Sequence, residues 1–390
     1  MESTALRVYI RDPSLQRLGQ VTDHTQITCV PRFNAIGAMV LEVSADSPSA
    51  PLLVEGNGLI VKTSSGQTVL SGPIRTVDWS RSRTDSGGGK LTVGAVSDDE
   101  ILARYTCWPA PALAIGSQSA AIYKINTAAV ETGMRDLVNL NAGPGALVTR
   151  KNPLLTLATN GLHGPALVRQ VNQFDNLLVT LQDIAAAAGL GFRVIQVGGG
   201  LQFQVYAPVD RSGTARLSFG LGNLADANYT TTPPTCTRAV VVAGGSSSPR
   251  VCKTYDRADP LFPGLVLEQF VDLTSVDTAS VDLAAQMDQA GAEALASGAG
   301  QGSLSVSPID IPNLRYGRDY NVGDTVAAQL RGGDWFADVV REVTLTSSAS
   351  EASVKATVGG DTGSNAVSRI YQYIAQLKRE LGRVKTRKAA

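Results

Sequence analysis

The stretch IRTVDWS at residues 74–80 decides the expected fold, because VREVTLT at residues 340–346 repeats its pattern. Both stretches read apolar-Arg-x-Val-x-apolar-Ser/Thr, and each is followed by a Lys-x-Thr-Val-Gly segment, at residues 90–94 and 355–359. Three further pairs match upstream at the same offset: Gly66 with Gly332, Leu70 with Phe336, and Ile60 with Val326. The echo predicts two related β-rich units. Simple alternation also makes unrelated strand pairs look alike, so a chance match stays open as the alternative.

Short β-rich runs separated by turn residues surround both stretches, which favours a small antiparallel barrel or sandwich in each. Between them the periodicity changes to that of helices, with Asp175 expected as an N-cap and Gly189 as a helix stop. The predicted fold class is a multidomain, β-rich α+β protein in which two small β-barrels flank an α+β middle region and a coiled-coil helix follows. The predicted domains are a first barrel (1–105), the middle domain (106–210), a second barrel with a helical insertion at about 250–300 (211–360), and the heptad helix (364–390).

A heptad pattern closes the sequence. Its apolar residues are spaced alternately three and four apart: Val367, Ile370, Ile374, Leu377, Leu381 and Val384. Such a stripe buries itself best against copies of itself, so these six residues are predicted to mediate oligomerisation. β-branched Ile370 and Val384 at d positions and Leu381 at an a position favour three strands or more. The alternative is a single amphipathic helix packed on its own domain, because the stripe is short for a coiled coil.

The composition excludes several classes of protein. The chain has 390 residues with 34 basic and 34 acidic side chains, so it lacks the positive charge of a general nucleic-acid binder. A basic cluster between Lys378 and Lys388 is read as a solvated face and tail of the terminal helix. Four scattered cysteines fit a reduced interior better than a disulfide scaffold. No signal peptide and no membrane-spanning apolar run are expected, so the protein is predicted to be made and kept in the cytoplasm or to leave it by a route other than secretion.

The sequence offers no catalytic, cofactor or metal constellation, so none of these sites is predicted. With two histidines and no CxxC pair, a clustered zinc site is not expected. No phosphate-binding loop, dinucleotide fingerprint or nucleophile elbow is present. His163 lies between glycines and is read as an exposed loop residue. The acidic cluster at 98–100 is read as a helix N-terminus stabilised by the dipole.

Motifs in a fixed order along nearly the whole chain resemble the minor tail proteins of siphophages that infect actinobacteria. They are quoted by their residues: AMVLEV (38–43), GLIV (58–61), LSGP (70–73), ETGMRD (131–136), NAGPGA (141–146), YGRDYNVGD (316–324) and VVREV (339–343). The family looks like the baseplate hub of long-tailed phages. The resemblance implies a trimeric hub with two tube-like barrels per chain, which joins the sixfold tail tube to the threefold tip around a DNA channel. Since the chain ends soon after the heptads, receptor binding or cell-wall cleavage by this polypeptide is not expected.

The resulting hypothesis is a non-enzymatic structural protein of the virion, located at the phage tail tip and assembled in the host cytoplasm. Its expected partners are two further copies of itself, tail-tube or distal tail proteins on one side, and tip, fibre or spike proteins on the other. No sequence-specific nucleic-acid partner is expected. The alternatives are a tail-associated cell-wall hydrolase, with its site within 106–200, and a receptor- or carbohydrate-binding module, for which aromatic residues are scarce.

Overall fold

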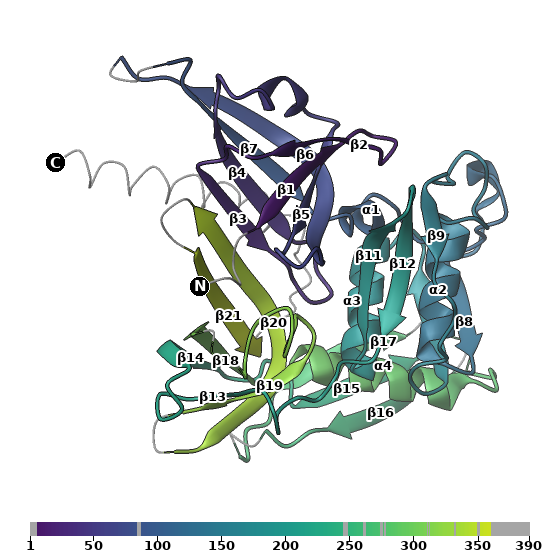
Figure 1. The fold of residues 1–390 in the computed structure, drawn as a ribbon. Helices are drawn as coiled ribbons and strands as arrows, with labels where there is room; N and C mark the ends of the chain where they lie inside the picture. Colours follow the sequence, from purple (N-terminus) through teal and green to yellow (C-terminus); the bar gives the residue numbers. More distant parts are fainter. Residues whose placement is uncertain are drawn as a thin grey trace.

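Antiparallel strands dominate the computed structural model, which describes residues 6–83, 87–244, 249–259, 263–273, 276, 278–309, 311, 313–330, 333–348 and 352–359. Thirteen strands join into one large sheet (Figure 1). Seven of them form what we call the first β unit: β1 (Arg7–Arg11), β2 (Arg17–Val21), β3 (Gln26–Val30), β4 (Ala38–Ser44), β5 (Gly58–Lys62), β6 (Thr68–Ser80) and β7 (Lys90–Val96). Six form the second β unit: β13 (Arg216–Leu217), β14 (Leu224–Thr232), β18 (Gln301–Pro308), β19 (Thr325–Gln329), β20 (Trp335–Ser348) and β21 (Ala352–Gly359).

The prediction of two separate barrels is wrong. Within the described residues neither unit closes on itself, and the strands run in the continuous order β14-β18-β21-β20-β3-β4-β7-β6-β5-β1-β2. A barrel closes when its first and last strands pair. Here β3, which lies at one end of the first unit in the order of the sheet, pairs instead with β20 of the second unit. Alternation along a strand shows which side faces the core but not which distant strand lies beside it, which is why the sequence did not reveal this join.

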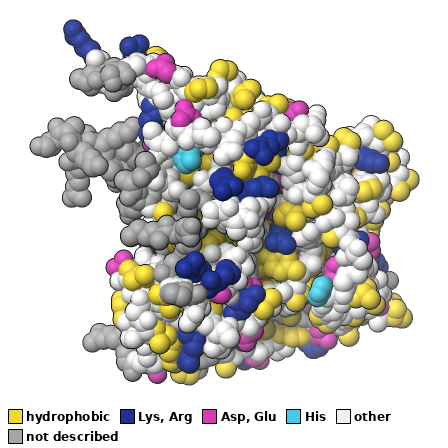
Figure 2. Space-filling model, viewed as in Figure 1, with side chains coloured by type: hydrophobic (Ala, Val, Ile, Leu, Met, Phe, Trp, Pro, Cys, Tyr) yellow, Lys and Arg dark blue, Asp and Glu magenta, His cyan; other side chains and the backbone are white. Residues whose placement is uncertain are grey.

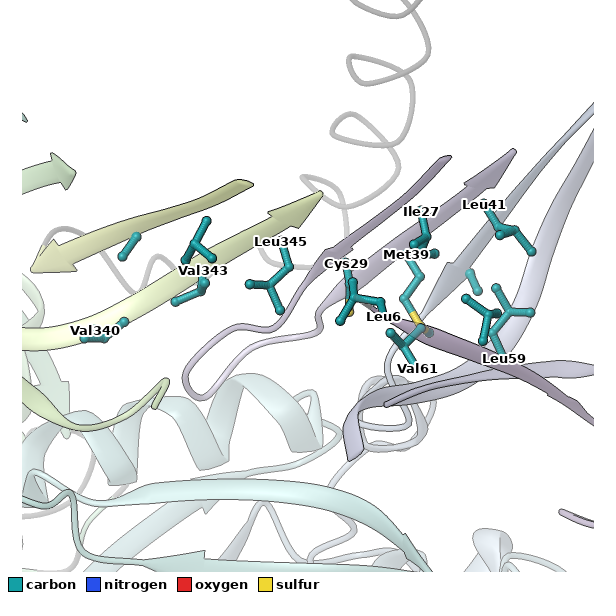
Figure 3. Close-up of a cluster of buried hydrophobic side chains, with 14 of the residues drawn as sticks. Leu6, Ile27, Cys29, Met39, Leu41, Leu59, Val61, Val340, Val343 and Leu345 are labelled. Carbon is teal, nitrogen blue, oxygen red and sulfur yellow. The ribbon is translucent and has the colours of Figure 1, made fainter. Parts of the chain in front are cut away.

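The two units therefore share one hydrophobic core. Side chains from both units belong to a single buried cluster that runs across the β3–β20 join. Figure 3 shows Leu345 of β20 beside Cys29 of β3, with Met39 and Leu41 of β4 continuing the row into the first unit. Because this apolar surface is buried between the units, separating them would expose it to water at a cost of about 25 cal/mol per Å².

The sequence echo corresponds to a repeated piece of structure. β6 and β20 are both long strands, and each carries a register shift at the arginine of the repeated motif, Arg75 in β6 and Arg341 in β20. A bulge at the same motif position is a specific feature, because it adds one unpaired residue and bends the strand. The two strands are therefore structural counterparts.

The neighbouring strands match in a different register from the one predicted. Lys90 pairs with Ser80, whereas Ser353 pairs with Thr346, the counterpart of Ser80. Ser353 rather than Lys355 is thus the counterpart of Lys90, and the Lys-x-Thr-Val-Gly match was two residues out of register. A shift of two keeps each side chain on the same face of the sheet, so alternation could not reveal it.

The middle region packs two helices against small sheets and has its own buried cluster. Its helices are α1 (Glu100–Ala103), the 3-10 helix η2 (Ile115–Ser117), α2 (Val130–Asn141) and α3 (Leu177–Ala188). Its strands are β8 (Ile122–Thr127), β9 (Leu155–Leu157), β10 (Leu167–Asn172), β11 (Gly191–Val197) and β12 (Gly200–Tyr206). The other 3-10 helix, η1 (Ala50–Leu52), lies in the first β unit. Asn176 caps α3 by accepting a hydrogen bond from the backbone N–H of Val179, so Asp175 is not the N-cap. Gly189 ends α3 with φ of 64°, as predicted.

A small three-stranded sheet with one helix is inserted into the second unit, between β14 and β18 in the chain. It contains β15 (Arg238–Ala243), β16 (Val251–Asp256) and β17 (Glu268–Leu273), covered by α4 (Leu283–Ser297), and it has a separate core. Figure 1 shows α4 lying below the middle region, beside β15 and β17. The domain boundaries proposed from the sequence stay predictions.

The predicted heptad helix lies outside the described residues, which end at Gly359. The coiled-coil part of the predicted fold class is accordingly without support from the structure. The role of the six heptad residues in oligomerisation stays a prediction.

Candidate assembly interface

The join between the two units shows how these β units contact one another. β3 and β20 pair antiparallel, with Leu345 opposite Cys29 and Thr346 opposite Thr28. Leu345 and Cys29 are 2% and 0% exposed. Beyond the strand pairs, Arg32 Nε lies 2.6 Å from Glu342 Oε2, and the backbone N–H of Phe33 donates to the carbonyl of Arg341. The join thus combines backbone pairing, a buried apolar contact and one ion pair.

Among the strand edges that lack such a neighbour within the described residues, two belong to strands that correspond to β20 and β3. The C-terminal part of β6 pairs with β7 along one edge, and β14 pairs with β18 along one edge. Trp79 near the end of β6 is 62% exposed, and Tyr229 of β14 is half-buried against Phe336 at a ring-centroid distance of 5.2 Å. Exposed strand edges are templates for pairing with another chain, so these two edges are candidate assembly surfaces.

The charged surface offers no comparable single feature. Figure 2 shows Lys and Arg side chains near the middle of one face, over the part of Figure 1 where β5 and β20 lie, with Asp and Glu side chains more scattered. The overall formal charge is zero.

The acidic cluster at 98–100 lies at the N-terminus of the short helix α1, as predicted, and has a further role that the sequence did not suggest. Only Glu100 belongs to the short helix α1, and Asp99 makes no side-chain cap. Asp98 instead forms a buried ion pair with Arg11 of β1 and accepts a hydrogen bond from the Ser71 hydroxyl at 2.6 Å. Arg11 also donates to Gln196 Oε1 at 2.6 Å. The cluster therefore fastens the first β unit to the middle region.

Asp99 completes this attachment. Its Oδ1 accepts from the backbone N–H of Val194 at 2.6 Å, and its Oδ2 accepts from the Ser97 hydroxyl. Burial raises the pKa of Asp99 to about 7, although these hydrogen bonds act to lower it. The carboxyl of an unfolded chain has a pKa of about 3.9. Between these two values the unfolded chain releases the proton and the folded protein keeps it.

We expect the free energy of unfolding to fall as pH rises from about 4 to about 7, because the folded state binds the extra proton in this window. Asp99→Asn keeps the acceptor for Val194 and cannot ionise, so its stability profile should be flatter between about pH 4 and pH 7. Urea unfolding at four pH values measures this. Asp334→Asn, at an exposed carboxylate, is the matched control and should keep the wild-type slope. Equal slopes for Asp99→Asn and the wild type would contradict the prediction.

His163 lies in a loop, as predicted, but the structure gives it a partner that the sequence did not suggest. Its Nδ1 lies 2.6 Å from Glu131 Oε2 in α2. Burial acts to raise the pKa of Glu131, but hydrogen bonds from the backbone N–H groups of Gly161 and His163 and from the imidazole lower it. Since Glu131 is occupied by these donors, the pair holds the loop against the start of α2.

A cleft of about 420 Å³ lies between α3, β10, α4 and β17. Polar and apolar side chains share its walls, and three carboxylates line it: Asp183, Asp272 and Glu293. The two half-buried ones, Asp183 and Glu293, lie 3.6 and 2.6 Å from Arg169. Burial raises the pKa of each carboxyl, and Arg169 opposes the shift. Within the described residues no group of His, Cys, Asp and Glu side chains could hold a metal ion. None of the helices in the described ranges is long and apolar enough to cross a membrane.

Comparison with known proteins assigns the chain to a family. The model of the family described as Siphovirus ReqiPepy6 Gp37-like protein matches residues 7–360. The chain belongs to this family. Membership confirms the siphophage resemblance carried by the sequence motifs. No curated protein sequence matched the chain.

Solved structures with the same fold are phage tail proteins. The 43 kDa tail protein of prophage MuSo2 from Shewanella oneidensis is 14% identical, with a TM-score of 0.56 and coverage of 90% of this chain and 98% of that chain. A tail protein from Neisseria meningitidis MC58 is 12% identical, with a TM-score of 0.56 and coverage of 92% and 97%. Prophage tail protein gp18 from Listeria monocytogenes EGD-e is 10% identical, with a TM-score of 0.55 and coverage of 96% and 99%. The fold of this family member is therefore one found in phage tail proteins.

Proposed function

We propose that this protein is a structural component of the siphophage virion and forms a trimeric hub at the tail tip. The hub joins the sixfold tail tube on one side to threefold tip, fibre or spike proteins on the other, and it surrounds the channel for DNA. Family membership and the tail-protein fold support the location, and the repeated β unit supports the symmetry.

The observation that carries this proposal is the pair of counterpart β units within one sheet. Three copies of a chain with two similar units present six similar units around an axis. Closed rotational symmetry is the usual arrangement of homo-oligomers, so a threefold assembly of this kind can face a sixfold partner. The single sheet across β3 and β20 fixes the two units relative to each other.

The proposed role needs no catalysis. The cleft beside α4 is the one observation that favours the alternative, a tail-associated cell-wall hydrolase, because the half-buried carboxylates Asp183 and Glu293 are among its lining residues. Both carboxylates are engaged by the same Arg169, which suits a structural ion-pair network better than an acid–base pair. A zymogram with host cell wall distinguishes the two roles. Clearing that is lost in Glu293→Gln would favour the hydrolase.

The assembly itself is tested by mass measurement of the purified chain and by imaging of tail particles. We expect a trimer in solution and density for the protein at the tail tip. A chain that stays monomeric at all concentrations and is absent from tail particles would refute the proposal.

The heptad residues supply a separate prediction. We expect Ile374→Asp to weaken the connection to the tip more than the ring itself, because a six-residue apolar stripe is too short to hold three chains alone. Mass measurement reports the ring, and co-purification with tip proteins reports the connection. Ser368→Asp, in the same segment but outside the stripe, is the control. Conversion of Ile374→Asp to monomers would reverse the proposed hierarchy.

A further inference from the structure

The join inside the chain provides a template for contacts between chains. The C-terminal half of β20 pairs with β21 along one edge and with β3 along the other. Its counterpart, the C-terminal half of β6, pairs with β7, the counterpart of β21. In the described residues no strand occupies the place beside β6 that β3 occupies beside β20. The question is which strand fits there.

The bulges fix the correspondence along the long strands. Trp79 follows the bulged Arg75 by the same number of residues as Leu345 follows the bulged Arg341. Trp79 is therefore the counterpart of Leu345. Leu345 is buried in the join, whereas Trp79 is 62% exposed. The large apolar side chain at this position is thus covered in one unit and uncovered in the other.

The counterpart of β3 in the second unit can be found by following the paired residues from strand to strand, starting at β6 in one unit and at β20 in the other. In the first unit the row runs through Val77, Val93, Leu41 and Ile27. In the second unit it runs through Val343, Ala356, Val306 and Ala227. β14 is therefore the counterpart of β3, and Tyr229 is the counterpart of Cys29, two residues along each strand.

We propose that β14 of one copy pairs antiparallel with the C-terminal half of β6 of the next copy, in the register that β3 and β20 use within the chain. This inference rests on the proposed trimeric hub and names the strands that join its subunits. Trp79 then lies opposite Tyr229, as Leu345 lies opposite Cys29. Ser80 lies opposite Asn228, as Thr346 lies opposite Thr28, so small or polar side chains face each other in both joins.

A second copy is the occupant that the structure favours. The two free edges are complementary to each other, since each is the counterpart of one half of a join that the chain already makes. They do not meet within one copy, because the described strands do not close into a barrel and six strands lie between β14 and β6 in the sheet. At about 4.8 Å per step the path between them is about 34 Å. A contact between β14 of one copy and β6 of the next joins two different surfaces, so it is heterologous. Such contacts close into a ring when the rotation between copies allows it.

Disulfide trapping tests this pairing directly. Opposite residues of antiparallel strands have Cα atoms about 4.5–5.5 Å apart, within the range that a disulfide spans. The background is full-length Cys252→Ser, which removes the exposed native thiol. In this background, trimers of Trp79→Cys/Tyr229→Cys should form covalent dimers and trimers on oxidation, seen on a denaturing gel and reversed by reductant. Each single variant should give none, and a mixture of the two single variants should give dimers only.

The register is tested with a matched pair. Trp79→Cys/Ala227→Cys uses the same strands and the same face, but the residues are diagonal, about 7–8 Å apart, and should crosslink poorly. Stronger crosslinking of this diagonal pair would overturn the register. A trimer by mass in which neither pair crosslinks would overturn the strand pairing and leave the hub intact, with the edges free for another tail protein. A monomer at every concentration would refute the hub as well. Circular dichroism of each variant checks that the fold is retained.

Discussion

Asp98→Ala is expected to lower the free energy of unfolding by about 3–5 kcal/mol, the usual cost of removing one partner of a buried ion pair. The side chains of Arg11 and Asp98 are 3% and 2% exposed, so the guanidinium left behind would stay in a low-dielectric interior. Gln196 would still accept one hydrogen bond from it but could not balance its charge. The loss should appear as a lower midpoint in urea unfolding.

The control is to remove the charges together. Arg11→Met/Asp98→Leu replaces the pair by apolar side chains and leaves no buried charge, so it should recover much of the lost stability. A surface comparison is Arg318→Met, whose partner Asp319 is partly exposed; this change should cost less than about 1 kcal/mol. If the double variant were as unstable as Asp98→Ala, packing rather than the unpaired charge would explain the loss.

Local chemistry explains what the sequence could predict. The end of α3 at Gly189 depends on neighbours along the chain, and the glycine itself indicated it. The β-rich character of both units followed from alternation. The repeated motif also led to the counterpart strands β6 and β20, because the bulge and the sequence pattern coincide at Arg75 and Arg341.

Distant pairings explain what the sequence could not predict. The β3–β20 join connects strands that are far apart in the sequence, and the residues of neither strand indicate which strand it pairs with. The same holds for Arg11 and Asp98. The acidic run at 98–100 was visible, but local reasoning assigned it to a helix dipole because its partners in β1 and β11 are remote in sequence. Trp79, an aromatic residue within the repeated motif, was the signal that could have indicated the proposed assembly edge.

Gly72→Ala is expected to destabilise the protein by about 3 kcal/mol or more, at the upper end of the cost of overpacking. A Cβ on Gly72 of β6 would lie 1.7 Å from the carbonyl oxygen of Val96 and 2.9 Å from the carbonyl carbon of Ser97. Both atoms belong to backbone, so no side-chain rotation can relieve the clash. Gly213→Ala is the control, because no atom lies within 4 Å of its added Cβ and stability should change little. Thermal and urea unfolding compare the two variants.

The position of this glycine connects the prediction to the Arg11–Asp98 pair. After β7 the chain crosses β6 at Gly72, and the backbone N–H of Asp98 donates to the carbonyl of Ser71 at 2.9 Å. A residue with a side chain at 72 would push the segment 96–98 away and carry Asp98 off Arg11. The cost of Gly72→Ala should therefore be less than additive with that of Asp98→Ala, since the first change already breaks the ion pair. Full additivity of the two costs would show that the segment absorbs the added methyl group without moving Asp98.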